Sequence, residues 1–431
     1  MNLRKTAKQF IPVGLYPAIE PSGHLVEAAL LNTINGFPGR GMKVIGVTGT
    51  NGKTSTAFLI HRMLHEAGYK VGLMTTVGYG VGAEITPQIH HMTNVSVPEL
   101  MRRLRWMKAQ GVDWLVLETT SHALAQNRVW GVPYSIAVLT NVTHEHLDYH
   151  RTFARYRDAK RKLFQLANRN RRGMRIGIIN AEDPSAQLFA QDIAHPILYG
   201  VDKGGVRATR VRLTAKGVKY DVVVGAETYK IACNLPGSFN VFNSLAAVCV
   251  GRAIGLTKSQ IEQGIAALEG VEGRMTRIDE GQAFDVIVDY AHTPDSFEKL
   301  FKDLKPVVKG KLIVMFGSAG RRDEAKRAVQ GELAGSYCDE VIITEEDDRD
   351  VDGAAILKQI ATGAQKAGKT LDTDLFLVPD RTAAIAYTIS RATKGDTVLL
   401  LGKGHEKTIE RANGENDWDE IGAAHAALRS R

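Results

Sequence analysis

Residues 43–58 read KVIGVTGTNGKTSTAF, an apolar run followed by a glycine-containing turn and the start of a helix. Gly49 and Gly52 lack a Cβ atom, so the backbone of this turn can take positive φ and approach an anion closely. The helix would direct its free N–H groups and the positive end of its dipole at the same anion. Lys53 adds a positive charge, and Thr54 offers a hydroxyl group to Mg²⁺. The stretch predicts a site for the phosphates of ATP or a similar nucleotide, formed by Gly49, Thr50, Asn51, Gly52, Lys53, Thr54 and Ser55.

The spacing differs from the strict phosphate-loop pattern G-x-x-x-x-G-K-[ST], because Val47 stands where that pattern has its first glycine. A plain turn between a strand and a helix is the alternative interpretation. Lysine and threonine directly after Gly52 favour the nucleotide site over that alternative.

The composition is typical of a globular chain with two or three domains. Its 431 residues exceed what one hydrophobic core usually serves, and 24% of them are charged. The net charge of +8 suits an anionic partner. The basic residues are scattered, however, and lack the interleaved aromatic residues of a single-strand groove. We therefore expect anionic small-molecule substrates and no nucleic acid.

The sequence also predicts a cytoplasmic protein. Cys233, Cys249 and Cys338 are far apart and odd in number, which is typical of a reducing compartment. The sequence contains no run of about 18 apolar residues, so we expect no transmembrane segment. The apolar patch at 11–19 contains two prolines and no small-residue cleavage site, which argues against a signal peptide.

Residues 41–272 alternate apolar runs with helical segments, which predicts an α/β domain. The runs at 114–118, 135–142 and 175–180 are β-branched and end in polar residues, as expected for parallel strands whose ends meet a ligand. Residues 206–231 alternate polar and apolar positions and predict an antiparallel meander. Residues 240–256 predict a strongly apolar helix.

A second α/β unit is expected over residues 273–431. Its apolar runs, separated by helices, predict a Rossmann-like sheet and lie at 284–293, 311–320, 339–349, 375–379 and 396–406. Residues 1–40 are expected to form a short N-terminal segment with one amphipathic helix at 24–37. The apolar stripe of that helix is expected to dock on a neighbouring domain rather than on a membrane.

Seven further segments carry a family resemblance. They read ETTSHALAQNRVWG (118–131), TNVTHEHLDYH (140–150), AKRKLF (159–164), GSFNVFN (237–243), VEGRM (271–275), VDYAHTPD (288–295) and GKGHE (402–406). With the phosphate loop they resemble the Mur ligase family, and within it the UDP-N-acetylmuramoyl-tripeptide synthetases. The resemblance implies a P-loop Mur ligase central domain with a mostly parallel sheet, followed by a Rossmann-like α/β C-terminal domain.

The resemblance implies an ATP-dependent amide ligase of peptidoglycan precursor synthesis, hence a role in cell wall biogenesis, cell shape and cell division. Such a ligase converts a carboxylate into an acyl phosphate, which an amine then attacks. The implied acceptor is the D-Glu of UDP-MurNAc-L-Ala-D-Glu, and the implied donor is a diamino acid. Phosphoryl transfer depends on positioning and charge neutralisation, so Mg²⁺ and cationic side chains are needed.

Two Mg²⁺ ions are expected. Glu118 ends an apolar run near the phosphate loop and can hold one ion together with Thr54. The resemblance implies that His146 is a further metal ligand. It also implies that Lys160 is carbamylated, which turns this residue into an anion for the second ion. The expected catalytic residues are Lys53, Lys160, Arg274 and His146.

Two asparagines are the candidates for binding the nucleotide base. Asn240 and Asn243 lie three residues apart, so both amides can face one pocket, and the resemblance assigns the second to adenine. Arg274 follows the domain hinge and is expected to reach the γ-phosphate only when the C-terminal domain closes. The residues that resemble those holding ribose and adenine, for which a capping role is the alternative, are Asp289, Tyr290 and His292.

The acceptor peptide is implied to bind at two segments. Thr120, Gln126 and Arg128 take the positions of a family motif S-x-x-x-x-x-Q-x-R, and Arg128 can fork onto a carboxylate. Thr93 and Asn94 stand where the family has Thr-Thr-Pro.

The donor pocket departs from the family pattern. Members that add diaminopimelate carry Asp-Asn-Pro-Arg where this chain has Glu346-Asp347-Asp348-Arg349. The arginine is implied to grip a distal carboxylate and favours meso-diaminopimelate, whereas the extra carboxylates would suit an ammonium and leave L-lysine open. The expected donor residues are Arg322, Asp347, Asp348, Arg349, Gly402 and Glu406.

The N-terminal part of the chain also departs from the family pattern. Roughly 40 residues precede the phosphate loop, too few for a domain with its own core, whereas the resemblance implies a whole domain that holds the uridine nucleotide. We expect this uridine grip to be missing, reduced or supplied by a partner protein. Two alternatives stay open: another ligase of the folylpolyglutamate or cyanophycin type, and a non-catalytic ATP-binding subunit of a ligase complex.

Overall fold

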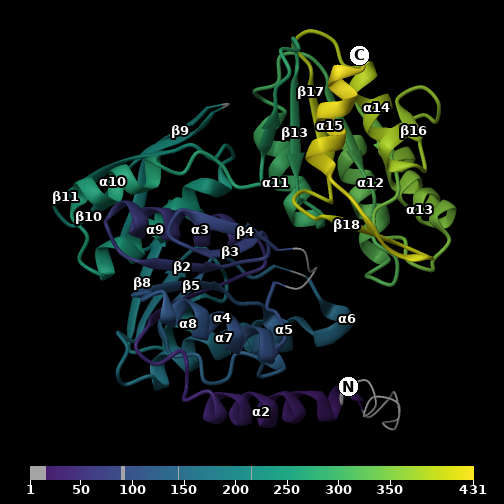
Figure 1. The fold of residues 1–431 in the computed structure, drawn as a ribbon. Helices are drawn as coiled ribbons and strands as arrows, with labels where there is room; N and C mark the ends of the chain where they lie inside the picture. The colour runs from purple at the N-terminus through teal and green to yellow at the C-terminus, as the bar shows by residue number, and fades with distance from the viewer. Residues whose placement is uncertain (1–15, 89–92, 144, 215) are drawn as a thin grey trace.

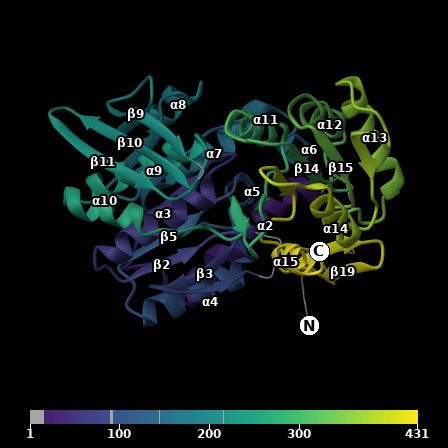
Figure 2. The same ribbon diagram turned by 90° about the horizontal axis from the view of Figure 1, so that it is seen from above.

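The computed structural model describes residues 16–88, 93–143, 145–214 and 216–431. They form two α/β units that lie side by side and a long N-terminal helix below the first unit (Figures 1 and 2). Each of the two large sheets falls within one of the predicted ranges, 41–272 and 273–431. The domain boundaries themselves remain predictions from the sequence.

Within the described residues the first sheet has eleven strands, in the order β11-β10-β9-β8-β7-β6-β1-β5-β2-β3-β4. Neighbours from β9 to β2 pair in parallel, and the two ends are antiparallel. The mostly parallel sheet is thus confirmed, and the predicted meander extends it as β9–β11. The strands are β1 (Lys43–Thr48), β2 (Val71–Met74), β3 (Gly78–Val81), β4 (Glu84–Pro87), β5 (Trp114–Glu118), β6 (Tyr134–Leu139), β7 (Ile176–Asn180), β8 (His195–Gly200), β9 (Val206–Thr214), β10 (Gly217–Val224) and β11 (Glu227–Cys233).

Helices cover both faces of this sheet, because its central strands are apolar on both sides. The strand β1, which carries the phosphate loop, lies in the middle and is buried from its second residue onward. On one face pack α3 (Lys53–Glu66), α9 (Phe239–Ala253) and α10 (Lys258–Ala266). On the other pack α4 (Val97–Ala109), α5 (Ser121–Ala125), α7 (Phe153–Arg169), which follows the short α6 (Leu147–His150), and α8 (Ala186–Gln191) (Figure 1).

The second sheet has six strands among the described residues, in the order β12-β13-β17-β14-β15-β16, parallel except for β12. This is the predicted Rossmann-like arrangement. The strands are β12 (Thr276–Ile278), β13 (Asp285–Asp289), β14 (Leu312–Phe316), β15 (Glu340–Ile343), β16 (Leu375–Leu377) and β17 (Thr397–Leu401). One face carries α11 (Pro294–Leu304), α12 (Ala325–Tyr337) and α13 (Gly353–Lys366), the other α14 (Arg381–Arg391) and α15 (Glu420–Arg429), and β18 (Thr408–Arg411) and β19 (Gly414–Asp417) form a hairpin.

The N-terminal helix differs from the predicted helix at 24–37. It is α2 (Tyr16–Ile34), which begins earlier and contains Pro21. It also ends earlier, because Gly36 and Phe37 take positive φ and the Phe37 N–H returns to the carbonyl of Asn32 at 2.7 Å. The first fifteen residues of the predicted segment lie outside the described residues.

The apolar stripe of α2 docks on the central domain in part, as expected, because Ala28 belongs to the buried core of that domain and Leu31 packs against it. Among the side chains described from residue 20 onward, Ala28 and Asn32 are the buried ones on this helix, whereas Val26, Leu30 and Ile34 are 58% to 70% exposed. Polar groups add to this contact, because the loop that the helix packs against presents a backbone carbonyl to Asn32 and donates from Asn127 to the carbonyl of Pro21.

Two further findings bear on the predicted class of protein. Among the described residues, no helix has the length and apolar character needed to cross a membrane. The three cysteines are all buried free thiols.

Candidate active site

The phosphate loop joins β1 to α3 at the carboxyl end of the central strand. Gly52, directly before α3, has a φ of 82°, a conformation that residues with a side chain rarely adopt. A Cβ atom on Gly52 would collide with the amide of Asn243, and one on Gly49 would collide with the hydroxyl of Thr140. Both glycines are therefore needed for the close approach of neighbouring elements.

The strand end after β6 holds this loop in place. The Thr50 N–H donates to the carbonyl of Asn141 at 2.8 Å, and the Asn51 N–H donates to Asn141 Oδ1 at 3.0 Å. The hydroxyl of Thr50 lies 3.0 Å from that of Tyr156. Lys53 Nζ donates to the carbonyl of Thr50 at 2.7 Å, so its charge lies at the loop. The sequence had not selected Asn141, although a polar residue at a parallel strand end was the available signal.

Thr54 and Glu118 meet as predicted. The Thr54 hydroxyl donates to Glu118 Oε2 at 3.0 Å, and Glu118 is 1% exposed at the end of β5. Glu118 also accepts from the hydroxyl of Thr76 at 3.1 Å and from its N–H at 3.2 Å. The sequence did not predict Thr76 as a site residue, because only the order of strands in the sheet brings the end of β2 beside β5.

These oxygens fit Mg²⁺, which prefers carboxylate and hydroxyl oxygens and keeps several water ligands. In the part of the chain that the structure describes, no group of three or more His, Cys, Asp or Glu side chains could hold a metal ion. A magnesium site here would therefore draw on Thr54, Glu118 and the oxygens of the substrates. Lys160 could contribute only after modification.

Lys160 is buried on α7, with 2% of its surface exposed. Its Nζ donates to the carbonyl of Gly49 at 2.7 Å and lies 4.3 Å from the ring centroid of Tyr156. Burial, assisted by the charge of Lys53, lowers the pKa of Lys160 well below its ordinary value. The structure thus favours the neutral amine, which is the form that can add carbon dioxide.

His146 lies next to a carboxylate that the sequence did not select. Its Nε2 is 3.8 Å from Glu145 Oε2, and burial lowers the pKa of His146. A neutral imidazole can act as a metal ligand. Glu145 also faces His292 Nε2 of the C-terminal domain at 3.3 Å, so it links the two domains. His144, the neighbour of His146 in the motif, lies outside the described residues.

A cavity of about 440 Å³ lies between the two domains beside the phosphate loop. Asn243 Nδ2 donates to Asn240 Oδ1 at 2.8 Å, so both amides on α9 face one place, as their spacing predicted. An apolar wall with a few convergent polar groups is typical of a small-molecule site. The predicted nucleotide residues lining it are Asn51, Gly52, Ser55, Asn240, Asn243, Arg274, Asp289, Tyr290 and His292, and apolar residues not predicted are Leu235, Phe239, Phe242 and Leu300.

Arg274 is already at the phosphate loop in this arrangement. Its Nη2 donates to Thr54 Oγ1 at 3.3 Å, and its guanidinium lies 4.6 Å from the ring centroid of Tyr290. The domains touch here, since Asn51 Nδ2 donates to Asp295 Oδ2 at 2.8 Å. In this arrangement the two domains already touch, and the expectation that Arg274 reaches the phosphates only in such a closed arrangement stays a prediction.

Asp289 and Tyr290 have partners within the protein. The Asp289 carboxylate accepts from the N–H groups of Met275 at 2.7 Å and Ala291 at 2.8 Å, and burial raises its pKa. The Tyr290 hydroxyl donates to Glu406 Oε1 at 3.0 Å. Asp289 thus holds the turn around the hinge, which is the capping role that the sequence left open.

The predicted acceptor residues gather around Asn94. Its Oδ1 accepts from the N–H and the hydroxyl of Thr120 at 2.8 and 2.9 Å, and its Nδ2 donates to the last carbonyl of β5 at 2.8 Å. Arg128 Nη1 donates to the carbonyl of Asn94. The Thr93 hydroxyl lies 2.7 Å from that of Thr76. These four residues therefore lie beside the magnesium candidates.

Gln126 and Arg322 are placed differently. Gln126 Nε2 donates to Oε2 of Glu20 on α2 at 3.1 Å. Arg322 is exposed on the C-terminal domain, and its charge is among those that, after burial, lower the pKa of His122 to about 3. Since His122 belongs to the central domain, Arg322 faces that domain.

The carboxylates expected to bind the donor have an internal cation. Lys403, fully buried, donates from Nζ to Asp347 Oδ1 at 2.9 Å and to Glu406 Oε2 at 2.5 Å. Gly402 has a φ of 106°, and a Cβ atom there would come within 2.9 Å of Glu346 Oε2. The sequence did not foresee that Lys403, in the same GKGHE segment, would neutralise this pair.

Arg349 also has a partner in place. Its Nε donates to Glu410 Oε2 at 2.7 Å, and its Nη1 donates to the carbonyl of Gly320 at 2.6 Å. Glu410 lies on β18, in a hairpin that no sequence signal had indicated. A carboxylate of a donor would have to replace Glu410 to make the predicted contact.

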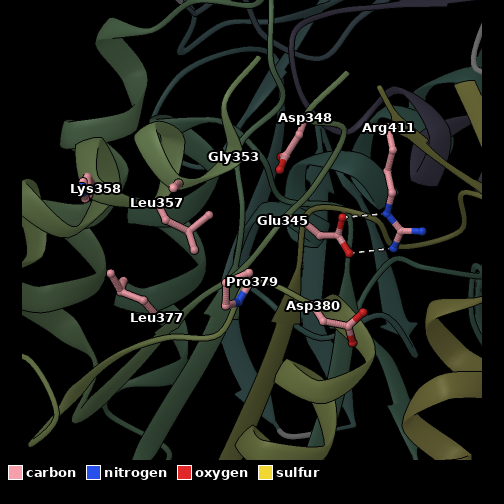
Figure 3. Close-up of a pocket in the computed structure, with 10 residues that line it drawn as sticks. Glu345, Asp348, Gly353, Leu357, Lys358, Leu377, Pro379, Asp380 and Arg411 are labelled. Carbon is pink, nitrogen blue, oxygen red and sulfur yellow. Dashed lines mark hydrogen bonds and ion pairs between the residues drawn. The ribbon is translucent and has the colours of Figure 1, made fainter. Parts of the chain in front are cut away.

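Asp348 points into a second cavity, of about 410 Å³, at the carboxyl ends of β15 and β16 (Figure 3). A bidentate pair between Glu345 and Arg411, at 2.7 and 2.8 Å, closes one side. Burial and the neighbouring carboxylates of Glu345, Glu346 and Asp347 raise the pKa of Asp348 to about 6. The two aspartates of the predicted donor loop therefore face different surroundings.

Comparison with known families agrees with this arrangement. The Mur ligase middle domain family matches residues 47–251, and the Mur ligase glutamate ligase domain family matches residues 273–404. Both stretches contain the predicted motifs.

Individual relatives span almost the whole chain. The UDP-N-acetylmuramyl-tripeptide synthetase of Roseiflexus sp. (strain RS-1) is 43% identical, over 96% of this chain and 84% of that protein. The UDP-N-acetylmuramoyl-L-alanyl-D-glutamate–2,6-diaminopimelate ligase of Geobacillus thermodenitrificans is 37% identical, over 99% and 86%. A solved structure of a ligase with that same name superimposes with a TM-score of 0.64, at 27% identity, over 96% of this chain and 83% of that one. The chain therefore belongs to the Mur ligase family, on the branch of the tripeptide synthetases that its motifs indicated.

Proposed function

We propose that this protein joins a diamino acid to the D-Glu of UDP-MurNAc-L-Ala-D-Glu, with ATP as the energy source, in the cytoplasmic synthesis of a peptidoglycan precursor. One observation carries the proposal. Thr54, Glu118 and Arg274 converge at 3.0 and 3.3 Å beside the cavity between the domains, next to the acceptor residues around Asn94. The names of the relatives supply the substrate class.

The reaction is proposed to pass through an acyl phosphate. The D-Glu carboxylate attacks the γ-phosphorus of ATP, the bond to the β-phosphate oxygen breaks, and ADP leaves. The amine of the donor then attacks the acyl carbon, loses a proton and displaces phosphate. Lys53 and Arg274, one from each domain, are placed to stabilise the charge on the transferred group.

Bound Mg²⁺ would neutralise phosphate charge and orient the oxygens for in-line transfer. Thr54 and Glu118 would hold one ion, and His146 with carbamylated Lys160 would help to hold a second. The lowered pKa of Lys160 supports the carbamate, because only a neutral amine adds carbon dioxide. Asn240, Asn243 and the apolar wall would take adenine, while Asp289, Tyr290 and His292 line the cavity where the ribose would lie.

For the donor we propose meso-diaminopimelate ahead of L-lysine. Arg349 and Arg322 can each pair with a distal carboxylate, which lysine lacks. The internal pair between Arg349 and Glu410 weakens this preference, since the carboxylate must displace it. The donor is therefore best identified directly.

The test measures release of ADP and phosphate with Mg-ATP, bicarbonate and UDP-MurNAc-L-Ala-D-Glu. Parallel reactions contain meso-diaminopimelate, L-lysine, L-ornithine or no amine. Release that needs both the nucleotide dipeptide and one amine is expected, with tripeptide seen by mass spectrometry. A protein that binds ATP yet is inactive in every reaction would contradict the proposal.

Additional reactions distinguish this proposal from the two alternative functions. A folylpolyglutamate-type or cyanophycin-type ligase would release phosphate with folate and glutamate, or with an aspartate-containing peptide, in place of the muramoyl dipeptide. A non-catalytic subunit would turn over only with a co-purifying partner, which would also supply the uridine grip. The convergence of Lys53, Arg274 and Glu118 favours the catalytic reading over the subunit.

A further inference from the structure

Helix α2 lies below the central domain in Figure 1, and hydrogen bonds join it to the segment at 126–130, which carries two predicted acceptor residues. Next to Gln126, whose Nε2 donates to Glu20 Oε2 at 3.1 Å, Asn127 Nδ2 donates to the carbonyl of Pro21 at 3.2 Å. Further along, Asn32 Nδ2 donates to the carbonyl of Trp130 at 3.1 Å. The helix therefore follows this segment for more than two turns.

Close packing reinforces the contact. Gly131, with a φ of 84°, leaves no room for a side chain, because a Cβ atom would come within 2.6 Å of the Asn32 amide. Beyond the end of α2, Arg105 Nη1 of α4 donates to Asn35 Oδ1 at 2.9 Å. Thus α2 is fixed at several places, and Glu20, the fifth residue of this helix, is held against Gln126.

Glu20 lies within the acceptor group rather than on open surface. Its side chain is 17% exposed and lies 3.8 Å from His24 Nε2. The Tyr149 hydroxyl, whose pKa burial raises, hydrogen-bonds with Gln126 and feels the charges of both Glu20 and Arg128. Four side chains from α2, α6 and the 126–128 segment are therefore close enough to interact.

The contact with Glu20 fixes which way the Gln126 amide faces. A glutamine amide has a donor end and an acceptor end, whereas an ionised carboxylate only accepts. A hydrogen bond to a charged group is stronger than one between neutral groups. Glu20 therefore holds the NH₂ end of Gln126 toward α2 and leaves Oε1 on the side away from the helix.

We propose that Glu20 is a positioning residue of the acceptor site. Its carboxylate orients Gln126 so that Oε1 accepts a peptide N–H of the muramoyl dipeptide. Glu20 itself does not contact the acceptor and acts through Gln126. This inference rests on the proposed function, because it takes the muramoyl dipeptide as the ligand.

The test is a double-mutant cycle on acceptor binding. Calorimetry gives the dissociation constant of UDP-MurNAc-L-Ala-D-Glu, and steady-state kinetics give KM for acceptor, ATP and amine. Glu20→Ala is expected to weaken acceptor binding about three- to tenfold, the range for one hydrogen bond, with KM for ATP and kcat unchanged. Glu20→Ala combined with Gln126→Ala is expected to bind no more weakly than Gln126→Ala alone.

Matched variants distinguish the orientation of Gln126 by Glu20 from a merely structural role in holding α2 in place. Asn35→Ala removes the contact with Arg105 at the other end of α2 and is expected to leave acceptor binding unchanged. Glu20→Gln keeps an oxygen that accepts a hydrogen bond but loses the charge and can present its NH₂ group instead, so it should recover only part of the loss seen in Glu20→Ala. If Glu20→Ala melts at a lower temperature than the wild type, the double-mutant cycle is repeated with Glu20→Met. Methionine is a good helix former and has no oxygen that could accept the hydrogen bond from Gln126.

Each contrary result overturns the proposal. Unchanged acceptor binding in Glu20→Ala, additive losses in the double variant, or an equal loss in Asn35→Ala would show that Glu20 does not act through Gln126. A wild-type protein that binds ATP but no muramoyl dipeptide would instead overturn the proposed function, and this inference with it.

Discussion

The two domains differ in whether their charged site residues have oppositely charged partners within the protein. At the phosphate loop of the central domain, the buried amine of Lys160 donates to a backbone carbonyl, and its pKa is lowered. In the C-terminal loop at 346–349, Asp347 is paired with Lys403, and Arg349 is paired with Glu410. The first site is arranged for charges that a ligand brings. The second already holds its own counter-charges.

This difference matters because the cost of binding differs. A cation or phosphate at the central site meets groups that are desolvated and in position, which strengthens electrostatic contacts. A donor carboxylate that binds Arg349 must replace Glu410, and such exchanges have small net effects at partly exposed positions. We therefore expect the phosphate loop to control turnover and the C-terminal loop to adjust the choice of donor.

The largest effect is expected at Lys160. Lys160→Ala should lower turnover at least about a thousandfold, because it removes the group that would carry the second metal ligand. Lys162→Ala, two residues along the same helix and exposed, should leave turnover unchanged. Phosphate-release kinetics and circular dichroism check activity and fold.

A chemical rescue sharpens this test. If Lys160 acts as a carbamate, short carboxylates such as acetate or formate should restore part of the activity of Lys160→Ala. Full activity of the folded variant without added carboxylate would contradict the carbamate. Lys53→Ala should be equally inactive but should not respond to carboxylates.

A smaller effect is expected at Asp348, which faces carboxylates of its own loop. Its pKa is raised from 3.8 to about 6, so the folded state holds its proton to higher pH than the unfolded state. Stability is then lost as pH rises from about 4 to about 6, and the loss is complete above that window. Asp348→Asn should be more stable at pH 7 by about 1–2 kcal/mol, less than the full shift implies because the side chain is partly solvated.

Urea unfolding of both proteins at pH 4, 5, 6 and 7 checks this prediction. The advantage of Asp348→Asn should vanish near pH 4. A constant difference at all four values would show that the carboxyl group does not titrate as described.

The smallest effect is expected at Glu410. Glu410→Gln removes the charge that holds Arg349 and should lower KM for meso-diaminopimelate about three- to fivefold, in line with one partly exposed ion pair. KM for L-lysine should not change, because lysine has no distal carboxylate. Equal changes for both amines would show that Arg349 does not read the distal group.

Much of the site could be predicted because its residues are neighbours in sequence. The strand, turn and helix at 43–58 were readable from apolar residues, two glycines and Lys-Thr, and Asn240 and Asn243 from their helical spacing. Thr76 and Glu145 were not, since Thr76 reaches Glu118 only through the order of β2 and β5 in the sheet. Sequence spacing carries no information about such neighbours.

Three contacts of charged groups could not be predicted from the sequence either. The partners of Asp347, Arg349 and Gln126 come from segments 56, 61 and 106 residues away. Helix α2 shows the same limit: its periodicity predicted a helix that docks, but not that Asn32 would join Ala28 and Leu31 in the docking face.

The sequence by itself determined the family, the two α/β units and the identity of the phosphate-binding, metal and acceptor candidates, because these are set by local backbone geometry and by motifs. Only the tertiary structure decided which of those charges meet an internal partner, that Arg274 reaches the phosphate loop, and that Glu20 faces Gln126. The physical reason is that burial and the pairing of charges depend on distances between elements that are far apart in the sequence.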